Sequence, residues 1–234
     1  MRTRTMILTI VAIAVLAAVG VAIALMLLLG PWLGLGVAAA AAAVVLALYY
    51  RIVRPWQLSW GATSDEVRGA MPGDELVEGA GGTTRAITIS APVERVWPWL
   101  AQIGYGRAGW YSYDWIDNDG HPSADQILPD FQDLWVGDRI LMAPGMGATV
   151  RAMETGSYVL STSDDGASWC LAVYPLADGQ TRLVSRWRAK WPRTLAVLFW
   201  ALVVDPGFFI MERKMLKGIK ARAERASAKL PVAA

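Results

Sequence analysis

The stretch that decides the fold is residues 84–103, "TRAITISAPVERVWPWLAQI". Its first seven residues alternate apolar with polar side chains and are rich in β-branched types, which predicts a strand. Pro92 fits the first position of a helix and Glu94 the third. Pro98 lies inside that helix and removes a backbone hydrogen bond, so we expect a kink there. Helical spacing gives this segment one apolar face, made by Val93, Val96, Trp97, Leu100 and Ile103.

The next residues, "GYGRAG" at 104–109, fit the glycine pattern of dinucleotide sites. Such a site needs the glycines after a strand and at the start of a helix, where the helix N-terminus meets the pyrophosphate. Here they follow an amphipathic helix instead. We therefore interpret Gly104 as the C-cap of that helix and expect no nucleotide site.

Downstream, the chain predicts a sheet followed by one long helix. Residues 119–135 are interpreted as a loop with a short helix, and Asp-Gly pairs separate some of the later strands. The C-terminal helix, 206–230, has an apolar stripe of Phe208, Met211, Met215 and Ile219. Strands segregated from helices indicate an α+β protein, with a curved antiparallel sheet around the last helix. The strands are expected at 138–143, 148–154, 158–163, 168–176 and 181–190.

These segments resemble the SRPBCC superfamily, which includes START lipid-transfer domains, birch-pollen-allergen-like proteins and polyketide cyclases. The resemblance spans about 84–229 and is carried by "TRAITISAPVERVWPWLAQIG", "VGDRI", "TRLVSRWRAK" and "MERKMLKGIKARAE". It is closest to membrane-anchored bacterial members. It implies a helix-grip fold with a cavity for an apolar ligand between the sheet and the C-terminal helix. It implies no shared catalytic residue.

An aromatic stretch, "WYSYDWIDN" at 110–118, offers the first candidate site. Its aromatic rings either pack in the hydrophobic core or line a binding pocket. A pocket would also contain a few polar groups that orient the ligand. Tyr113 and Asp114 are the polar groups we expect in that role. Trp169, Trp187 and Met211 line the same cavity unless they only pack the core. The candidate ligand-binding residues in this region are Trp110, Tyr111, Tyr113, Asp114 and Trp115.

Three arginines, Arg182, Arg186 and Arg188, share one face of the last strand by period-two counting. They form a solvated outer face, or Arg186 reaches an acidic head group of the ligand.

His121, the only histidine, is expected in a solvated loop, with a general-base role as the alternative. One histidine and one cysteine, Cys170, make a zinc site improbable, and we expect neither a metal nor a cofactor.

At the N-terminus, no residue from 6 to 50 carries a charge. One membrane span needs roughly 20 apolar residues, so the run is long enough for two passes broken at Gly30–Pro31. We predict helices at 6–29 and 33–50 within an anchor of residues 1–54, a linker at 55–83 with a short helix near 64–70, and a helix-grip domain at 84–230. A cleaved signal peptide is the alternative. Arginines at both ends of the run predict a multi-pass protein of the inner or plasma membrane with its soluble domain in the cytoplasm.

Residues 195–204 are apolar but too short to span a bilayer, so we expect an interfacial or docked helix there. The basic residues that follow would face anionic lipid. The formal net charge of +2 argues against nucleic-acid binding.

Three functions remain open. The first is binding of a lipid or other hydrophobic small molecule without catalysis. The second is a cyclase-like or hydrolase-like enzyme that uses Asp114, Tyr113 or His121 as acid and base. The third is a scaffold or sensor whose interior is filled by its own tryptophans.

Overall fold

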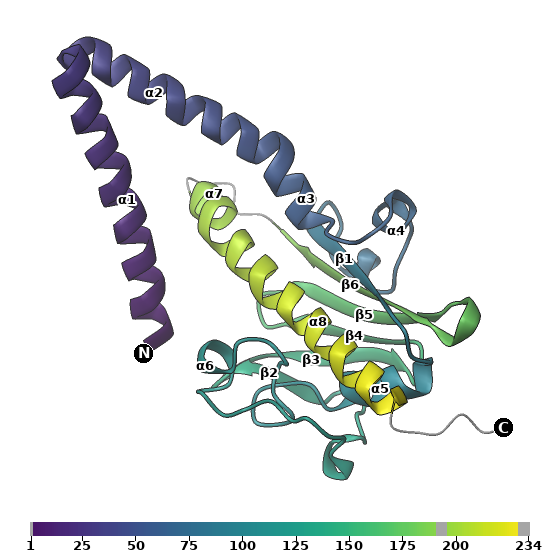
Figure 1. Ribbon diagram of the computed structural model, residues 1–234. Helices are drawn as coiled ribbons and strands as arrows, with labels where there is room; N and C mark the ends of the chain where they lie inside the picture. The colour runs from purple at the N-terminus through teal and green to yellow at the C-terminus, as the bar shows by residue number, and fades with distance from the viewer. Residues whose placement is uncertain (1, 191–195, 229–234) are drawn as a thin grey trace. The chain divides into compact units, whose positions relative to one another are not determined.

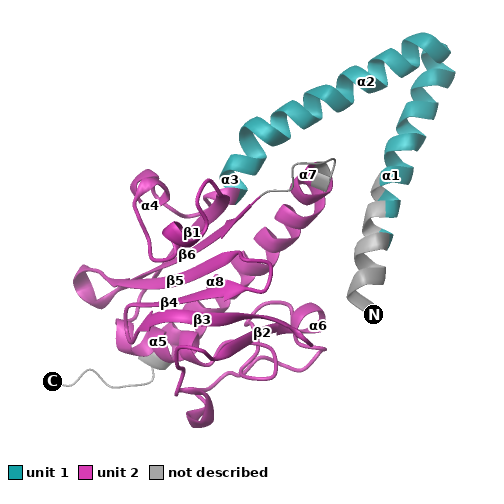
Figure 2. Cartoon of the chain, turned by 180° about the vertical axis from the view of Figure 1, so that it is seen from behind, with its two compact units in different colours: residues 1–57 teal, residues 58–234 magenta. Residues whose placement is uncertain are grey.

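A computed structural model describes residues 2–190 and 196–228. Contacts divide the chain into two compact units, residues 1–57 and 58–234 (Figure 2). The sequence-based boundary at residue 54 lies close to this division. Leu195, Lys229 and Leu230, which the sequence assigns to predicted helices, lie outside the described residues.

The first unit is helical. It contains α1 (Arg2–Leu29), α2 (Pro31–Leu48), a π-helix (Tyr49–Val53) and the start of α3 (Arg54–Leu58). The predicted break is confirmed: Gly30 has a φ of 85°, a left-handed value that favours glycine, and Pro31 opens α2.

Only one candidate membrane span is found among the described residues of this unit. The continuous helix Pro31–Leu58 is long and apolar enough to cross a bilayer and is mostly exposed. The first helix offers a shorter apolar stretch, Val15–Leu29. The structure thus supports one span near the N-terminus rather than the predicted two, and its length and composition suit an anchor or a signal sequence.

The second unit is a six-stranded antiparallel sheet with α8 (Asp205–Ala228) packed on one face (Figure 1). The helix α5 (Val93–Ala101) follows the first strand and packs against α8 and the sheet. This confirms the α+β arrangement of a sheet on a long C-terminal helix. In the order β1-β6-β5-β4-β3-β2, the strands are β1 (Gly81–Ile89), β6 (Thr181–Ala189), β5 (Ser168–Pro175), β4 (Tyr158–Ser163), β3 (Met146–Glu154) and β2 (Arg139–Ala143).

Two local predictions need correction. The amphipathic helix ends at Ala101 with Gln102 as its C-cap, so Gly104 is not the cap. Gly104, with a φ of 133°, instead forms a small bridge with Gly109. The aromatic stretch also contains a one-turn helix, α6 (Asp114–Asp117), which its composition did not indicate.

The core lies between the sheet and α8. Ile89 and Leu183 from the strands, Leu100 from α5, and Leu216 and Ile219 from α8 are all buried within it. The stripe predicted for α8 is wrong at its start, because Phe209 is buried while Phe208 is 48% exposed.

The opposite face of the sheet is covered by residues 58–77, which we call the strap. Met71 of the strap packs with Ala86, Cys170 and Val184 in a second buried cluster. The short helix expected near 64–70 is α4 (Ser64–Arg68). Thr63 and Glu66 close a capping box at its start, which satisfies two backbone N–H groups.

The other short elements are 3₁₀ turns and a broken helix. The turns are Asp74–Leu76, Pro129–Phe131 and Ala177–Gly179. Before α8 come α7 (Ala196–Phe199) and a π-helix (Trp200–Val204), so the apolar segment after residue 195 is helical where it is described.

Candidate functional site

Four aromatic rings form a continuous row between the sheet and α8, which we call the aromatic row. The ring centroids of Trp110 and Trp169 are 5.6 Å apart, those of Trp169 and Trp187 6.1 Å, and those of Trp187 and Phe208 6.0 Å. Trp110 and Trp169 are each 7% exposed, whereas Phe208 is 48% exposed. The row therefore runs from the core to the surface.

Strand register explains the middle of the row. Trp169 on β5 and Trp187 on β6 are directly opposite each other, so their side chains lie on the same face. Phe208, in the first turns of α8, packs against the ring of Trp187. Trp110 directly follows Gly109, whose antiparallel bridge with Gly104 reverses the direction of the chain after α5. Sequence reasoning found the three tryptophans but missed Phe208 as the outer end.

The indole N–H groups of the row differ in their partners. That of Trp169 donates to the Ser185 hydroxyl at 2.9 Å. That of Trp110 is buried and has no hydrogen-bond partner among the described residues. A buried donor without an acceptor costs about 1–3 kcal/mol, so an acceptor from water or a ligand would be favoured there.

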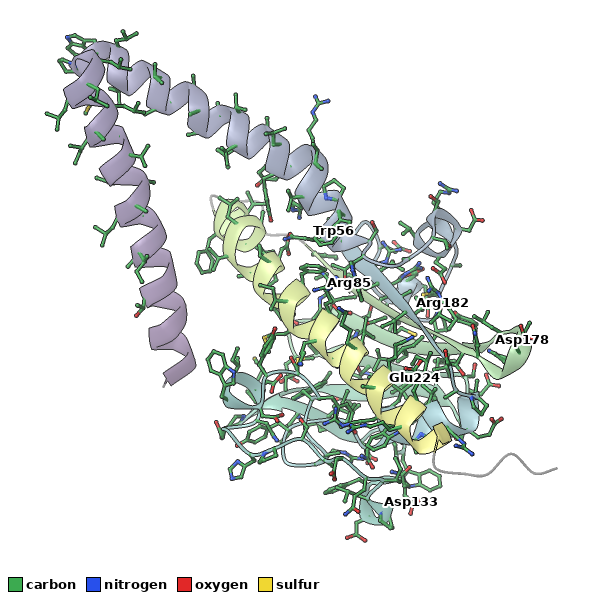
Figure 3. All side chains as sticks on the ribbon, in the orientation of Figure 1. Trp56, Arg85, Asp133, Asp178, Arg182 and Glu224 are labelled. Atoms are coloured by element: carbon green, nitrogen blue, oxygen red, sulfur yellow. The ribbon has the colours of Figure 1, made fainter. Side chains whose placement is uncertain are left out.

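A buried ion pair lies next to the row. The Arg85 guanidinium on β1 pairs with the Glu212 carboxylate on α8, and their side chains are 1% and 11% exposed. Figure 3 shows Arg85 where β1 passes alongside α8. The Arg85 guanidinium also lies 5.4 Å from the ring centroid of Phe209. Nothing in the sequence pattern indicated this pair, whose members are 127 residues apart.

Tyr111 belongs to the core. It is 2% exposed, its hydroxyl donates to the Trp99 carbonyl at 3.2 Å, and its ring meets Trp99 edge-on. Burial raises the pKa of its phenol, so the hydroxyl stays protonated. Its carbonyl lies so close to Gly218 of α8 that a Cβ there would be only 2.2 Å away, which requires glycine.

The other residues of the aromatic stretch lie toward the surface. Tyr113 and Trp115 pack edge-on at 6.4 Å, and Trp115 is 59% exposed. Asp114 accepts a hydrogen bond from the Ser123 hydroxyl, which itself accepts from the Tyr111 N–H, so it braces the loop. Met211 is half-buried on α8, and its carbonyl accepts a hydrogen bond from Ser112.

Arg186 lies on the strap side of the sheet, away from the face that carries the aromatic row. Its guanidinium pairs with Asp74 at 2.6 Å and donates to the Gly69 carbonyl at 2.7 Å and the Thr84 hydroxyl at 3.0 Å. The predicted common face of the three arginines is confirmed, but the face is covered: Arg182 pairs with Glu66, and Arg188 with Asp74 (Figure 3 labels Arg182). Contact of Arg186 with a ligand in the aromatic row does not fit this position.

The β6 arginines that face the strap also change the pKa of a strap carboxylate. The Arg182 hydrogen bonds hold the pKa of Glu66 below its ordinary value, although burial opposes them. The Glu66 carboxylate therefore stays charged at neutral pH, and its ion pair with Arg182 holds the strap on the sheet.

The remaining titratable candidates show little sign of a site. His121 is exposed, and its Nδ1 lies 3.1 Å from the Asn118 carbonyl. Cys170 is buried under the strap, where burial raises the pKa of its thiol to about 12 and keeps it inert. Within the described ranges, no group of three histidine, cysteine or acidic side chains is placed to hold a metal ion.

An open groove of about 560 Å³ lies apart from the aromatic row. It is lined by Leu76 at the end of the strap and by polar residues of β3, β4 and the turn after β4, among them Thr149, Arg151 and Thr162. It is open to solvent and lined mainly by polar residues, so it does not match the apolar cavity that the resemblance implies.

Asp117, at the end of α6, is buried, and burial raises the pKa of its carboxyl to about 6. The neighbouring Asp114 carboxylate adds to the shift, whereas the Ser112 hydroxyl opposes it. A folded-state pKa above the unfolded value of about 3.9 means that protonation of Asp117 favours folding. Its stabilising effect is therefore complete below that unfolded pKa and is lost as pH rises through the folded pKa.

We expect Asp117→Asn to match the wild type in melting temperature near pH 4 and to exceed it by a few degrees at pH 7. Thermal unfolding of the full chain at a series of pH values measures the difference. Asp133→Asn, at an exposed position labelled in Figure 3, serves as control and should show no such trend. A difference between Asp117→Asn and wild type that does not vary with pH would disprove the assignment.

Comparison with known proteins gives a likeness of fold only. No protein-family model and no curated protein matches the chain. A solved protein from Nitrosospira multiformis is 18% identical, with a TM-score of 0.40, and covers 64% of this chain and 100% of its own. A polyketide-cyclase-like protein from Corynebacterium glutamicum is 16% identical (TM-score 0.34; 66% and 96% covered). An AHSA1-like protein from Aeromonas hydrophila is 18% identical (TM-score 0.35; 65% and 99% covered).

The fold assignment itself rests on the strand order and the C-terminal helix, and none of the similarities identifies a ligand or a reaction.

Proposed function

We propose that this chain binds a hydrophobic small molecule against the aromatic row and is held at a membrane by its N-terminal helix. The observation that carries the proposal is the row itself. It joins a buried indole, whose N–H has no partner in the part of the chain that the structure describes, to a half-exposed phenylalanine. Binding sites for small molecules are mostly apolar and aromatic, with a few polar groups that set orientation.

The row suggests how such a ligand would lie. A flat or chain-like apolar molecule would enter beside Phe208 and pack on Trp187 and Trp169. A carbonyl or ether oxygen at its inner end would accept the Trp110 N–H. The ligand is thus expected to be apolar with at least one hydrogen-bond acceptor. No reaction is needed for this role, and we propose none.

The anchor is the helix Pro31–Leu58. Arg51 and Arg54 lie toward its C-terminal end, and no charge lies in the 25 residues before it. Because cytoplasmic flanks of membrane helices are enriched in lysine and arginine, this distribution favours the second unit on the cytoplasmic side of the cell membrane. A binding domain placed there would have bilayer lipids and other membrane-dissolved molecules within reach.

A fluorescent ketone, acedan (an acetyl-dimethylamino-naphthalene), tests the binding site. Its emission reports the polarity of its surroundings, and it carries a carbonyl acceptor. We expect saturable binding to the full chain in lipid nanodiscs after the signal from empty nanodiscs is subtracted. Trp187→Ala should weaken binding by roughly tenfold or more, because it removes a large ring contact. Trp110→Phe keeps the ring and loses one hydrogen bond, so about a two- to tenfold loss is expected.

The control is Trp135→Ala, at a position 68% exposed, which should bind acedan as the wild type does. Absence of saturable binding to the wild type, or equal loss in all three variants, would contradict the proposal.

A further inference from the structure

A second surface of this unit is apolar where a water-soluble protein would be polar. It spans α7, the π-helix and the first turns of α8. Four apolar side chains on it are exposed by 38% to 56%: Val197, Phe199, Leu202 and Ile210. Large contiguous apolar patches are uncommon on monomeric soluble proteins and usually mark an interaction surface.

The exposed charges that the first half of α8 carries beside this patch are positive. Lys214 and Lys217 are exposed, and they follow Ile210 at the spacing of one and two helical turns, which places all three on one side of α8. Between residues 196 and 220 the only carboxylates are Asp205 and Glu212. Asp205 is 6% exposed, and the Glu212 side chain is 11% exposed and paired with Arg85, so neither offsets the lysines at the surface.

We propose that this surface, the α8 docking surface, binds the face of an anionic phospholipid bilayer. Its apolar side chains would enter the boundary between headgroups and acyl chains, while Lys214 and Lys217 extend their ammonium groups to the phosphates. Basic side chains close to an anionic surface are attracted to it, and residues 196–220 expose no carboxylate that would oppose this attraction.

Phe208, two residues before Ile210, projects from about the opposite side of α8 and packs on Trp187, so its ring belongs to the aromatic row rather than to the α8 docking surface. The inference goes beyond the proposed function, because the surface can bind a bilayer whether or not the row holds a ligand.

The test uses the full chain in nanodiscs of phosphatidylcholine with or without phosphatidylglycerol. An environment-sensitive NBD label is attached to Ile210→Cys in a Cys170→Ala background. The control carries the label at Val136→Cys, an exposed site in the loop before β2. With phosphatidylglycerol, we expect blue-shifted emission at position 210 and strong quenching by lipids with a nitroxide in the acyl chain. Position 136 should stay water-exposed and unquenched.

Lys214→Glu with Lys217→Glu should reduce the quenching at position 210 several-fold. Quenching there no stronger than at position 136, or equal in discs with and without phosphatidylglycerol, overturns the proposal. A shielded label that lipid does not quench also overturns it, because protein would then cover the surface. Acedan binding measured in the same discs separates the two proposals: its loss while position 210 remains quenched would count against the ligand site alone.

Discussion

Replacing Arg186 with methionine should lower the free energy of unfolding by about 3–5 kcal/mol, the usual cost of removing one partner from a buried ion pair. Arg186 is 1% exposed and donates to the Asp74 carboxylate, the Gly69 carbonyl and the Thr84 hydroxyl. Methionine fills much of the volume but donates to none of them. The strap should then detach from the sheet before the rest of the unit unfolds.

Chemical denaturation of the full chain in mild detergent, followed by tryptophan fluorescence, measures this loss. The matched control is Arg139→Met, which breaks an ion pair with Asp164 whose side chains are 42% and 63% exposed. Exposed pairs contribute about 1 kcal/mol or less, so this variant should stay near wild type. Equal losses in the two variants would show that the strap does not depend on Arg186.

Arg85→Met should have a comparable effect, about 3–5 kcal/mol, for a different reason. The variant leaves the Glu212 carboxylate without its ion-pair partner beneath the sheet. One of its oxygens is already buried and accepts no hydrogen bond from any described residue. An unpaired charge in that position is strongly disfavoured.

The double variant Arg85→Met with Glu212→Met should recover most of the stability, because apolar side chains of similar volume often replace a buried ion pair without loss. The same denaturation measurement applies to the single and double variants. A double variant that is less stable than Arg85→Met alone would mean that Glu212 is stabilised by other groups and that the pair is not the reason for the loss.

The fold could be predicted well from the sequence because its signals are local. Alternation and β-branched residues place β1, and the turns between the later strands separate them clearly, so that β4 begins and ends where predicted. The one-turn helix α6 was missed because only tertiary contacts, such as that between Asp114 and Ser123, hold it. Two membrane spans were predicted because hydropathy was read across the whole uncharged run, whereas among the described residues one helix is both long and apolar enough to cross a bilayer.

The site was only partly predictable. Trp169 and Trp187 were placed correctly on neighbouring strands, and counting by two correctly grouped Arg186 with Arg182 and Arg188. The alternation of side chains along a strand shows which residues share a face of the sheet, but not whether other residues cover that face. Here the face is covered because the arginines pair with Glu66 and Asp74 in the strap, more than a hundred residues away. Long-range pairs of single charges, such as Arg85 with Glu212, leave no pattern in the sequence.

The central claim is that the aromatic row holds a small hydrophobic molecule, and native mass spectrometry of the full chain tests it most directly. The chain should be released from mild detergent or nanodiscs without denaturation. We predict that the wild type and Trp135→Ala carry an additional small-molecule mass, or gain one after incubation with acedan, and that Trp187→Ala does neither. A wild-type chain that is folded yet carries no such mass and gains none would contradict the account.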